Sequence, residues 1–142
     1  MNHVGVAVPD LETAVARYRD IFNATDISDV ITLEDRGLYV QFVNLPTGQV
    51  ELIAPMHDKT AIAKFLEKNP EGGQHHICFE VADIHEAVAD MKAKNIRVLG
   101  EPRVGAHGTP VIFLHPKDMG GCLLYTSPSP RDQRGSRMPS SA

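Results

Sequence analysis

Cysteine is scarce in this chain, and long apolar runs are missing. Cys78 and Cys122 are the only cysteines among 142 residues. Two cysteines without metal-ligand spacing are too few for a disulfide framework, which favours a reducing compartment. The apolar stretches are far shorter than the roughly 18 residues that indicate a membrane-spanning helix. Met1 is followed at once by a strand-like segment, so we expect no targeting sequence within the chain.

Positive charge is limited as well. The 14 Lys and Arg residues stand against 18 Asp and Glu, giving a formal net charge of -4, and they form no long cluster. There is therefore no electrostatic reason to expect a nucleic acid partner, although an anionic small molecule is compatible. The absence of a glycine-rich phosphate loop, of GxSxG and of HExxH disfavours nucleotide-binding, serine hydrolase and metalloprotease functions. With 42% hydrophobic residues, the chain is long enough to bury a core.

A sequence repeat organises the chain. The segment 3–11 aligns without gaps on 76–84, and each copy begins with a histidine, His3 or His76. Both copies predict a β-branched strand, an aspartate N-cap and an amphipathic helix. The caps are Asp10 and Asp83, and the matching helix residues are Ala14, Val15 and Tyr18 in the first copy and Ala87, Val88 and Met91 in the second. Two copies of one strand-helix unit are therefore predicted.

Further strands are predicted after each helix. The strand-like runs are 37–43 and 49–53 in the first copy, and 96–99 and 111–114 in the second. A short helix over 60–68, capped by Thr60, and a linker over 69–73 separate the copies. We expect a single α+β domain over residues 1–121, with module one at 1–56, a linker helix segment at 57–73 and module two at 74–121.

Residues 122–142 do not continue this pattern. The second copy needs one more strand after Gly121, and 122–125 is compatible with its start. From Thr126 on, prolines and low apolar content predict that the segment cannot lie in a sheet. Residues 122–132 and 136–142 resemble the translated ends of a transposon-type sequencing adapter. We therefore expect 122–142 to be a non-native tail, with a natural disordered tail as the alternative.

His3 and His76 are candidate metal ligands. They occupy equivalent positions on the first strand of each copy, so an approximate two-fold between the copies would bring them together. Neutral imidazole is a common metal ligand, and a shared site between two sheets needs ligands that point inward from strands. The alternative is that both histidines survive from the duplication, or that each is a buried core residue with satisfied hydrogen bonds.

Glu51 is the candidate third ligand. Strand alternation places Glu51 on the face opposite Val50 and Leu52. If that face is buried, the carboxylate must be paired or metal-bound, because an isolated buried charge is unstable. A solvated carboxylate at a sheet edge is the alternative. Two histidines and one carboxylate with open positions are a ligand set used by Fe, Co, Mn or Zn.

The other candidate residues are less well defined. His75 points to the face of its strand opposite His76, which makes it a supporting or a surface residue. His107 lies on a glycine-bracketed loop that is able to touch a ligand. We expect three further histidines in turns or facing solvent: His57, His85 and His115. The cations available to an anionic substrate, among which the spacing does not select, are Arg36, Lys64, Arg97, Arg103 and Lys117.

The histidine-led repeat resembles the vicinal oxygen chelate superfamily, and the local sequence is similar to the methylmalonyl-CoA epimerase family. The segments that carry the resemblance are 2–4, 7–12, 50–52, 62–66, 73–77, 105–108 and 111–118. The resemblance implies paired βαβββ modules that form an open, cup-shaped mixed sheet around a divalent metal. The animal members of the family are mitochondrial, which implies a transit peptide upstream of Met1 and a location in the mitochondrial matrix. A cytoplasmic location is the alternative.

The resemblance also assigns the metal site. The family's metal ligands fall on His3, Glu51 and His76. A fourth ligand, a glutamate in the family, falls on Tyr125, where a phenol is a poor replacement at neutral pH. The implied cofactor is a divalent ion, Co²⁺ ahead of Mn²⁺, Zn²⁺ or Ni²⁺. The implied partner is an acyl-CoA substrate, without nucleic acid or membrane, and members of the superfamily often form homodimers.

The implied activity is the interconversion of (2R)- and (2S)-methylmalonyl-CoA in propionyl-CoA catabolism. This reaction removes an α-proton flanked by a thioester and a carboxylate and returns one on the opposite face. A divalent ion would stabilise the enolate as a Lewis acid, with Glu51 as a ligand or as one of two bases. The alternatives are a glyoxalase- or dioxygenase-type enzyme of the same superfamily, a metal-free binding module of the same fold, or a truncated chain that folds poorly.

Overall fold

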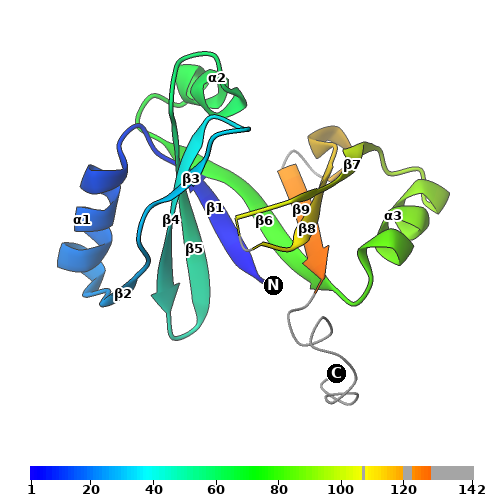
Figure 1. Cartoon of the computed structure of the whole chain (residues 1–142), viewed down its shortest axis with the longest axis horizontal. Coiled ribbons are helices and arrows are strands. Elements are labelled where there is room, and N and C mark those ends of the chain that lie inside the picture. The colour runs from blue at the N-terminus through cyan, green and yellow to red at the C-terminus, as the bar shows by residue number, and fades with distance from the viewer. Residues whose placement is uncertain (107, 120–122, 129–142) are drawn as a thin grey trace. The chain divides into compact units, whose positions relative to one another are not determined.

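The computed structural model describes residues 1–106, 108–119 and 123–128 (Figure 1). By its internal contacts the chain divides into two compact units, which are described here one at a time. The first unit comprises residues 2–76, and the second comprises Met1 together with the residues from Ile77 on. No helix in the described ranges is long and apolar enough to cross a membrane.

The first unit is a mixed sheet with two helices. Its elements are β1 (His3–Ala7), α1 (Leu11–Phe22), β2 (Asp26–Ile27), β3 (Ile31–Leu33), β4 (Leu38–Leu45), β5 (Gly48–Pro55), α2 (Ala61–Lys68) and the start of β6 (Gly73–Val81). Strand β5 pairs in parallel with β1 and antiparallel with β4. The short strands β2 and β3 both pair antiparallel with β4. The parallel β1–β5 pair puts the first histidine strand beside the strand that carries Glu51.

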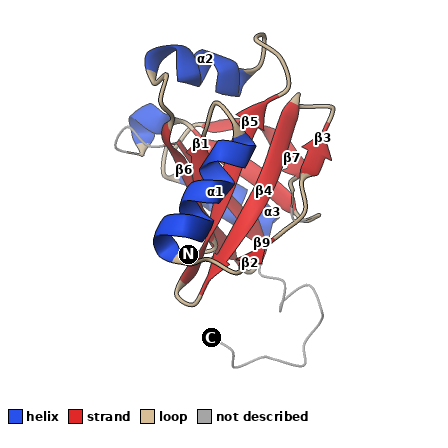
Figure 2. Ribbon diagram, turned by 90° about the vertical axis from the view of Figure 1, so that its left-hand side faces the viewer, coloured by secondary structure: helices blue, strands red, loops and turns tan. Residues whose placement is uncertain are grey.

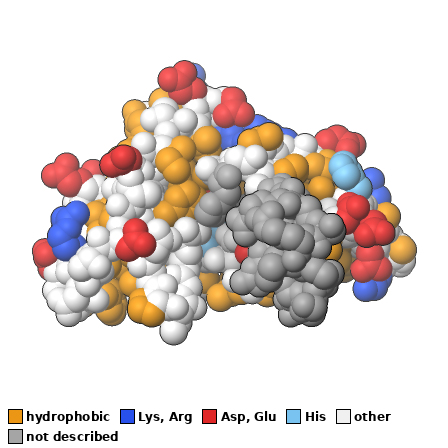
Figure 3. Space-filling view, turned by 60° about the horizontal axis from the view of Figure 1, so that its bottom comes forward, with side chains coloured by type: hydrophobic (Ala, Val, Ile, Leu, Met, Phe, Trp, Pro, Cys, Tyr) orange, Lys and Arg blue, Asp and Glu red, His pale blue; other side chains and the backbone are white. Residues whose placement is uncertain are grey.

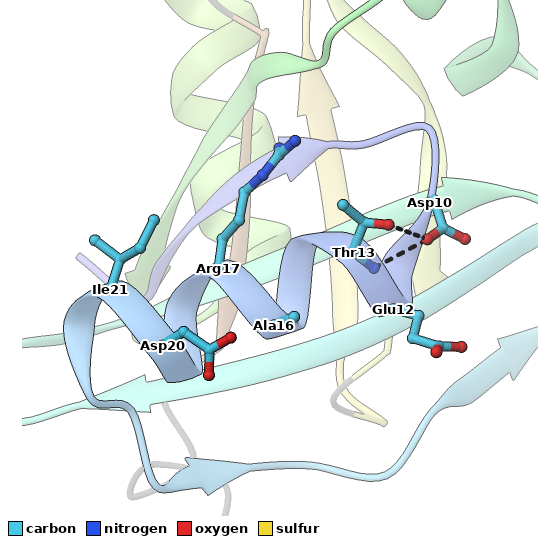
Figure 4. A pocket seen from close by; sticks show the side chains of 7 residues that line it. All are labelled: Asp10, Glu12, Thr13, Ala16, Arg17, Asp20 and Ile21. Carbon is cyan, nitrogen blue, oxygen red and sulfur yellow. Dashed lines mark hydrogen bonds between the residues drawn. The ribbon is translucent and has the colours of Figure 1, made fainter.

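Helix α1 begins at the predicted aspartate. The side chain of Asp10 accepts hydrogen bonds from the backbone N–H of Thr13 at 2.9 Å and from its hydroxyl at 2.6 Å (Figure 4). This satisfies a donor that the first turn leaves unpaired. The helix ends at Asn23, which adopts the left-handed conformation with φ 56°. The N-cap signal is local, which is why the sequence predicts the start of this helix correctly.

The core of the first unit lies between α1 and one face of its sheet. Ala14 and Val15 of the helix pack with Val43, Leu52 and other apolar side chains in one buried cluster, and Figure 2 shows α1 lying along the sheet strands. Side chains alternate between the two faces of a strand. Because Leu52 points toward the helix, Glu51 points to the opposite face of the sheet. The predicted orientation of Glu51 is therefore confirmed.

Helix α2 and the turn after it bring the chain to β6. The hydroxyl of Thr60 accepts from the N–H of Ala63 at 3.0 Å, as the capping prediction requires. The turn that follows depends on Gly72, which has φ 96°. A Cβ at Gly72 would lie 2.7 Å from the carbonyl oxygen of Ala7, so only glycine fits there without a shift of the backbone.

The second unit repeats the helix-on-sheet arrangement. Its elements after β6 are α3 (Ile84–Ala93), β7 (Val98–Val104), β8 (Pro110–Leu114), the 3₁₀ turn η1 (Pro116–Asp118) and β9 (Leu123–Pro128). Asp83 caps α3 by accepting from the N–H groups of His85 and Glu86. Strand β8 pairs antiparallel with both β7 and β9, and α3 contacts these three strands. The predicted α+β class is confirmed.

Three sequence-based expectations about strands need correction. The prediction that the chain leaves the sheet at Thr126 is wrong, because β9 runs to Pro128. Its paired residues Leu124, Tyr125 and Thr126 all carry N–H groups, and Pro128 lies beyond the last of them. Strand β7 extends past the predicted end at Leu99 to Val104, with its register shifting between Leu99 and Arg103. The short strands β2 and β3 were not predicted at all.

Candidate metal centre

Three strands place His3, Glu51 and His76 together within the first unit. In the β1–β5 pair Gly5 is opposite Glu51, and His3 lies two residues from Gly5 on the same face. His76 comes from the start of β6. All three side chains are buried, with residue exposures of 1%, 5% and 2%. The structure thus brings together the three residues that the sequence selected.

The three side chains meet through one atom each. Oε1 of Glu51 lies 3.3 Å from Nε2 of His3 and 3.2 Å from Nε2 of His76. The two Nε2 atoms are 3.2 Å apart. Ligand atoms held about 2.1 Å from one ion at tetrahedral or octahedral angles lie roughly 3.0–3.4 Å from each other. The spacing of the cluster therefore fits a single small divalent cation.

The hydrogen bond at Nδ1 of His3 also supports a cation at the cluster. Nδ1 of His3 is 2.6 Å from Oδ1 of Asn2. An amide oxygen can only accept, so Nδ1 carries the proton and Nε2 of neutral His3 presents a lone pair to the carboxylate. Two acceptor atoms at contact distance repel each other unless a proton or a cation lies between them. The donor set, two imidazole nitrogens and one carboxylate oxygen, suits a divalent metal.

The electrostatics keep Glu51 ionised. Burial by itself raises the pKa of Glu51, but hydrogen bonding to His3 and His76 and the Coulombic attraction of these two side chains lower the pKa to about 2. Burial lowers the pKa of His76, although hydrogen bonding to Glu51 opposes this shift. The cluster therefore holds a carboxylate beside an imidazole that resists protonation, which is the ionisation state that a metal ligand needs.

Aromatic rings surround the cluster. Phe42, opposite Glu51 in the β4–β5 pair, meets the ring of His3 edge to face, with centroids 6.2 Å apart. His75 contacts His76, with their Nδ1 atoms 2.8 Å apart, and its ring packs on Phe65 of α2. Burial lowers the pKa of His75 to about 4, so it is neutral at physiological pH. Strand alternation did not predict that the His75 ring would reach back to its neighbour.

The other sequence candidates lie elsewhere. His57 and His85 are exposed, and His115 accepts from the N–H of Lys117 in the turn before η1, as expected. His107 lies outside the described residues, as does the side chain of Tyr125, whose backbone pairs with Phe113. Among the five candidate cations, Arg97 is ion-paired with Asp118 at 2.9 Å, and three are exposed: Lys64, Arg103 and Lys117.

A concavity lies on the outer face of α1 (Figure 4). It is open to solvent, and its polar groups include Asp10 and Thr13, which are already engaged in capping the helix. The lysine and arginine side chains visible in Figure 3 are scattered and do not gather into one patch. Among the described residues, the buried cluster is therefore the better candidate for chemistry.

Comparison with known proteins identifies the family of the chain. The model of the Glyoxalase/Bleomycin resistance protein/Dioxygenase superfamily matches residues 2–113. Ethylmalonyl-CoA/methylmalonyl-CoA epimerase of Cereibacter sphaeroides is 51% identical over 126 residues, covering 87% of this chain and 93% of the relative. The chain belongs to the methylmalonyl-CoA epimerase family of this superfamily.

Other proteins named as methylmalonyl-CoA epimerases are similar to this chain in sequence and in fold. Mitochondrial methylmalonyl-CoA epimerase of Homo sapiens is 52% identical over 125 residues, covering 87% of this chain and 70% of the human protein. A variant of Streptomyces coelicolor methylmalonyl-CoA epimerase, solved with 2-nitronate-propionyl-CoA, matches with a TM-score of 0.82 at 33% identity. That match covers 92% of this chain and 96% of the solved chain. The fold that the family resemblance implies, the vicinal oxygen chelate fold, is confirmed.

Proposed function

We propose that this protein interconverts the (2R) and (2S) forms of methylmalonyl-CoA. The observation that carries the proposal is the buried His3–Glu51–His76 cluster, in a chain about half identical to proteins named as methylmalonyl-CoA epimerases. The acyl-CoA analogue bound by the Streptomyces coelicolor relative supports an acyl-CoA substrate. The reaction must remove the α-proton between the thioester and the carboxylate and return a proton on the other face.

We propose His3, Glu51 and His76 as ligands of a divalent ion, with Co²⁺ as the preferred ion. When bound, such an ion supplies positive charge that stabilises the negative charge developing on the substrate as the α-proton leaves. The strands of the first unit hold the three ligand atoms 3.2–3.3 Å apart. Their burial excludes water from the polar contacts and so strengthens them.

Glu51 is better suited to be a ligand than a base. Its Oε1 is in contact with both imidazole nitrogens, which leaves that atom poorly placed to meet a substrate proton. Its pKa of about 2 is also far below neutrality, and an efficient general base has a pKa near the working pH. We therefore assign proton transfer to groups other than Glu51.

The activity is tested by isotope exchange. The purified chain is loaded with Co²⁺ and incubated with (2R,2S)-methylmalonyl-CoA in D₂O, and loss of the α-proton signal is followed by NMR. A second protein carries the family-type ending: Cys122→Val, Leu124→Val, Tyr125→Glu and Thr126→Leu. We expect exchange in both proteins, faster in the second because the family glutamate is restored. Absence of Co²⁺ binding and of exchange in both proteins would refute the proposal.

Two substitutions at Glu51 separate the ligand role from the base role. A glutamine keeps an oxygen ligand but cannot accept a proton as a base. We expect Glu51→Gln to retain Co²⁺ binding with reduced affinity and measurable exchange, whereas Glu51→Leu loses both. Exchange abolished in Glu51→Gln with Co²⁺ affinity unchanged would instead make Glu51 a base.

The same assay separates the other functions of the superfamily. A glyoxalase- or dioxygenase-type enzyme would bind Co²⁺ or a similar ion through the same three residues and leave the α-proton of methylmalonyl-CoA in place. A metal-free binding module would bind no ion at all. Among these, the family identity supports the epimerase.

A cellular setting and an assembly complete the proposal. We propose a role in propionyl-CoA catabolism and, since the human relative is named as mitochondrial, the mitochondrial matrix as the place of action. A homodimer is the proposed assembly, because members of the superfamily often pair. The mass measured by light scattering tests the assembly: a value near 15.5 kDa would contradict the dimer.

A further inference from the structure

The residue before each cluster histidine contacts the ring of that histidine. Oδ1 of Asn2 lies 2.6 Å from Nδ1 of His3, and Nδ1 of His75 lies 2.8 Å from Nδ1 of His76. Positions 2–3 and 75–76 are equivalent in the sequence repeat. Neighbouring side chains on a strand normally point to opposite faces, so these two contacts arise from the particular side chains and not from strand geometry.

We propose that Asn2 and His75 are positioning residues that hold His3 and His76 in the tautomer whose Nε2 binds the metal ion. The inference rests on the proposed metal site and extends it to two residues that do not touch the ion. A metal-binding imidazole generally donates its other N–H to an oxygen or nitrogen acceptor, which fixes both the tautomer and the orientation of the ring.

Asn2 fixes the proton of His3 in one place. Its amide oxygen can only accept, so the proton is on Nδ1 of His3. The Nε2 atom of neutral His3 then directs its lone pair at the cluster, where Oε1 of Glu51 and Nε2 of His76 lie within 3.3 Å. An Nε2–H tautomer would lose the hydrogen bond to Asn2 and could not bind a metal through Nε2.

His75 decides between two arrangements of His76. If His75 donates, Nε2 of His76 carries its ring proton toward Glu51 and cannot coordinate. If His76 donates, its Nε2 is available to a cation, and His75 keeps its own proton on Nε2. The ring of Phe65 meets that of His75 at 85° with centroids 5.2 Å apart, which holds the acceptor in reach of His76. A cation at the cluster therefore selects the second arrangement.

The repeat supplies matched variants for the test. His75→Phe keeps an aromatic ring against Phe65 and removes the acceptor, whereas His75→Asn introduces the side chain that the first copy uses. Asn2→Leu removes the amide, and Asn2→His introduces the side chain of the second copy. His85→Phe, at an exposed position on α3, is the control for losing a histidine. Thermal unfolding of each metal-free protein checks that it is folded.

Affinity for Zn²⁺ and Co²⁺ is measured by competition with a chelator. We expect His75→Phe and Asn2→Leu to bind roughly 10- to 100-fold more weakly than the unmodified protein, as is usual when the hydrogen-bond partner of a metal ligand is lost. His75→Asn and Asn2→His should recover at least half of that loss on a logarithmic scale. His85→Phe should bind as the unmodified protein does.

The tautomers are read directly from ¹⁵N spectra of the histidine side chains. In the metal-free protein we expect His3 to be protonated on Nδ1, and in the Zn²⁺-loaded protein we expect the same for His76. A residue that only packs against the rings would leave these signals unchanged when it is replaced. Asn2→Leu should therefore shift His3 toward a mixture of tautomers, and Asn2→His should restore the single form.

The outcomes separate this inference from the proposed function. Unchanged affinity in His75→Phe and Asn2→Leu, equal losses in His75→Phe and His75→Asn, or an Nε2–H tautomer of His3 would overturn the positioning role. Failure of the unmodified protein to bind either ion would instead overturn the proposed metal site. In that case the metal-free spectra still decide whether Asn2 sets the tautomer of His3.

Discussion

The imidazole of His76 lies directly against the backbone of Gly5, with no room for a side chain between them. A Cβ built on Gly5 would be 2.0 Å from Cε1 of the ring and 2.5 Å from its Nε2. Gly5 is also opposite Glu51 in the β1–β5 pair. The missing side chain therefore creates the space in which the ring reaches Oε1 of Glu51 at 3.2 Å.

Gly5→Ala should displace the ring of His76. We expect a loss of about 1–3 kcal/mol in the free energy of unfolding of the metal-free protein, typical of overpacking, and weaker Co²⁺ binding. Urea denaturation and a Co²⁺ titration measure the two effects. Gly48→Ala is the control, because a Cβ there meets nothing within 4 Å.

A double-mutant cycle identifies the cause of that loss. If the clash is with the imidazole, Gly5→Ala should cost much less stability in a His76→Ala background than in the unmodified protein. An equal cost in both backgrounds would mean that His76 is not the group displaced.

Metal removal should lower the stability of the folded protein. An ion that binds only the native state adds about 2.7 kcal/mol at 100 times its Kd, which corresponds to a rise in Tm of roughly 5–10 °C. Thermal unfolding with Co²⁺ and with EDTA measures the difference, and His76→Ala should show none. A Co²⁺ effect of equal size in His76→Ala would place the ion elsewhere.

The repeat explains why the cluster was predictable from the sequence. Duplication puts His3 and His76 at equivalent positions. Leu52 lies in the core that faces the helix. Because side chains alternate along a strand, the neighbouring Glu51 points to the other face. The capping aspartates act on their own N–H groups within three residues, so the helix starts were also readable from local sequence.

The elements that the sequence did not predict depend on partners distant in the chain. Strands β2 and β3 are two and three residues long, too short to show a period, and exist because β4 offers them hydrogen bonds. The contact of His75 with His76 depends on ring orientations that Phe65 sets from another element. Neither effect leaves a pattern in the neighbouring residues.

Thr60→Ala should destabilise the first unit. The buried hydroxyl of Thr60 caps α2 through the N–H of Ala63, and loss of such a cap costs about 1 kcal/mol. Thr60→Ser keeps the hydroxyl and should retain most of the stability. Urea midpoints of the three proteins test this. Equal losses in Thr60→Ser and Thr60→Ala would assign the effect to the methyl group, which contacts the Gly37 region.

The source gene should diverge from this sequence near codon 122. Residues 122–132 and 136–142 resemble a translated sequencing adapter, and the family glutamate expected at position 125 is absent. Amplification of the gene from source DNA tests this expectation. A product that encodes Cys122 to Ala142 as printed would contradict it and would make the tail native.

The ion pair of Arg97 with Asp118 should give the second unit an acid-sensitive element. The guanidinium of Arg97 and its backbone N–H both donate to the Asp118 carboxylate and hold its pKa below the usual range. A lowered pKa in the folded state means that the unfolded state binds more protons as the pH falls. The contribution of Asp118 to stability is therefore complete above about pH 4, the ordinary carboxyl pKa, and declines progressively as the pH falls toward the lowered pKa of the folded state. We expect Asp118→Asn to lower the urea midpoint at pH 7 and to lower it less at pH 3.

Asp90→Asn, which removes an exposed pair with Lys94, is the control and should change the midpoint little at either pH. A difference between Asp118→Asn and the unmodified protein that stays constant from pH 7 to pH 3 would show that the charge of Asp118 does not stabilise the fold.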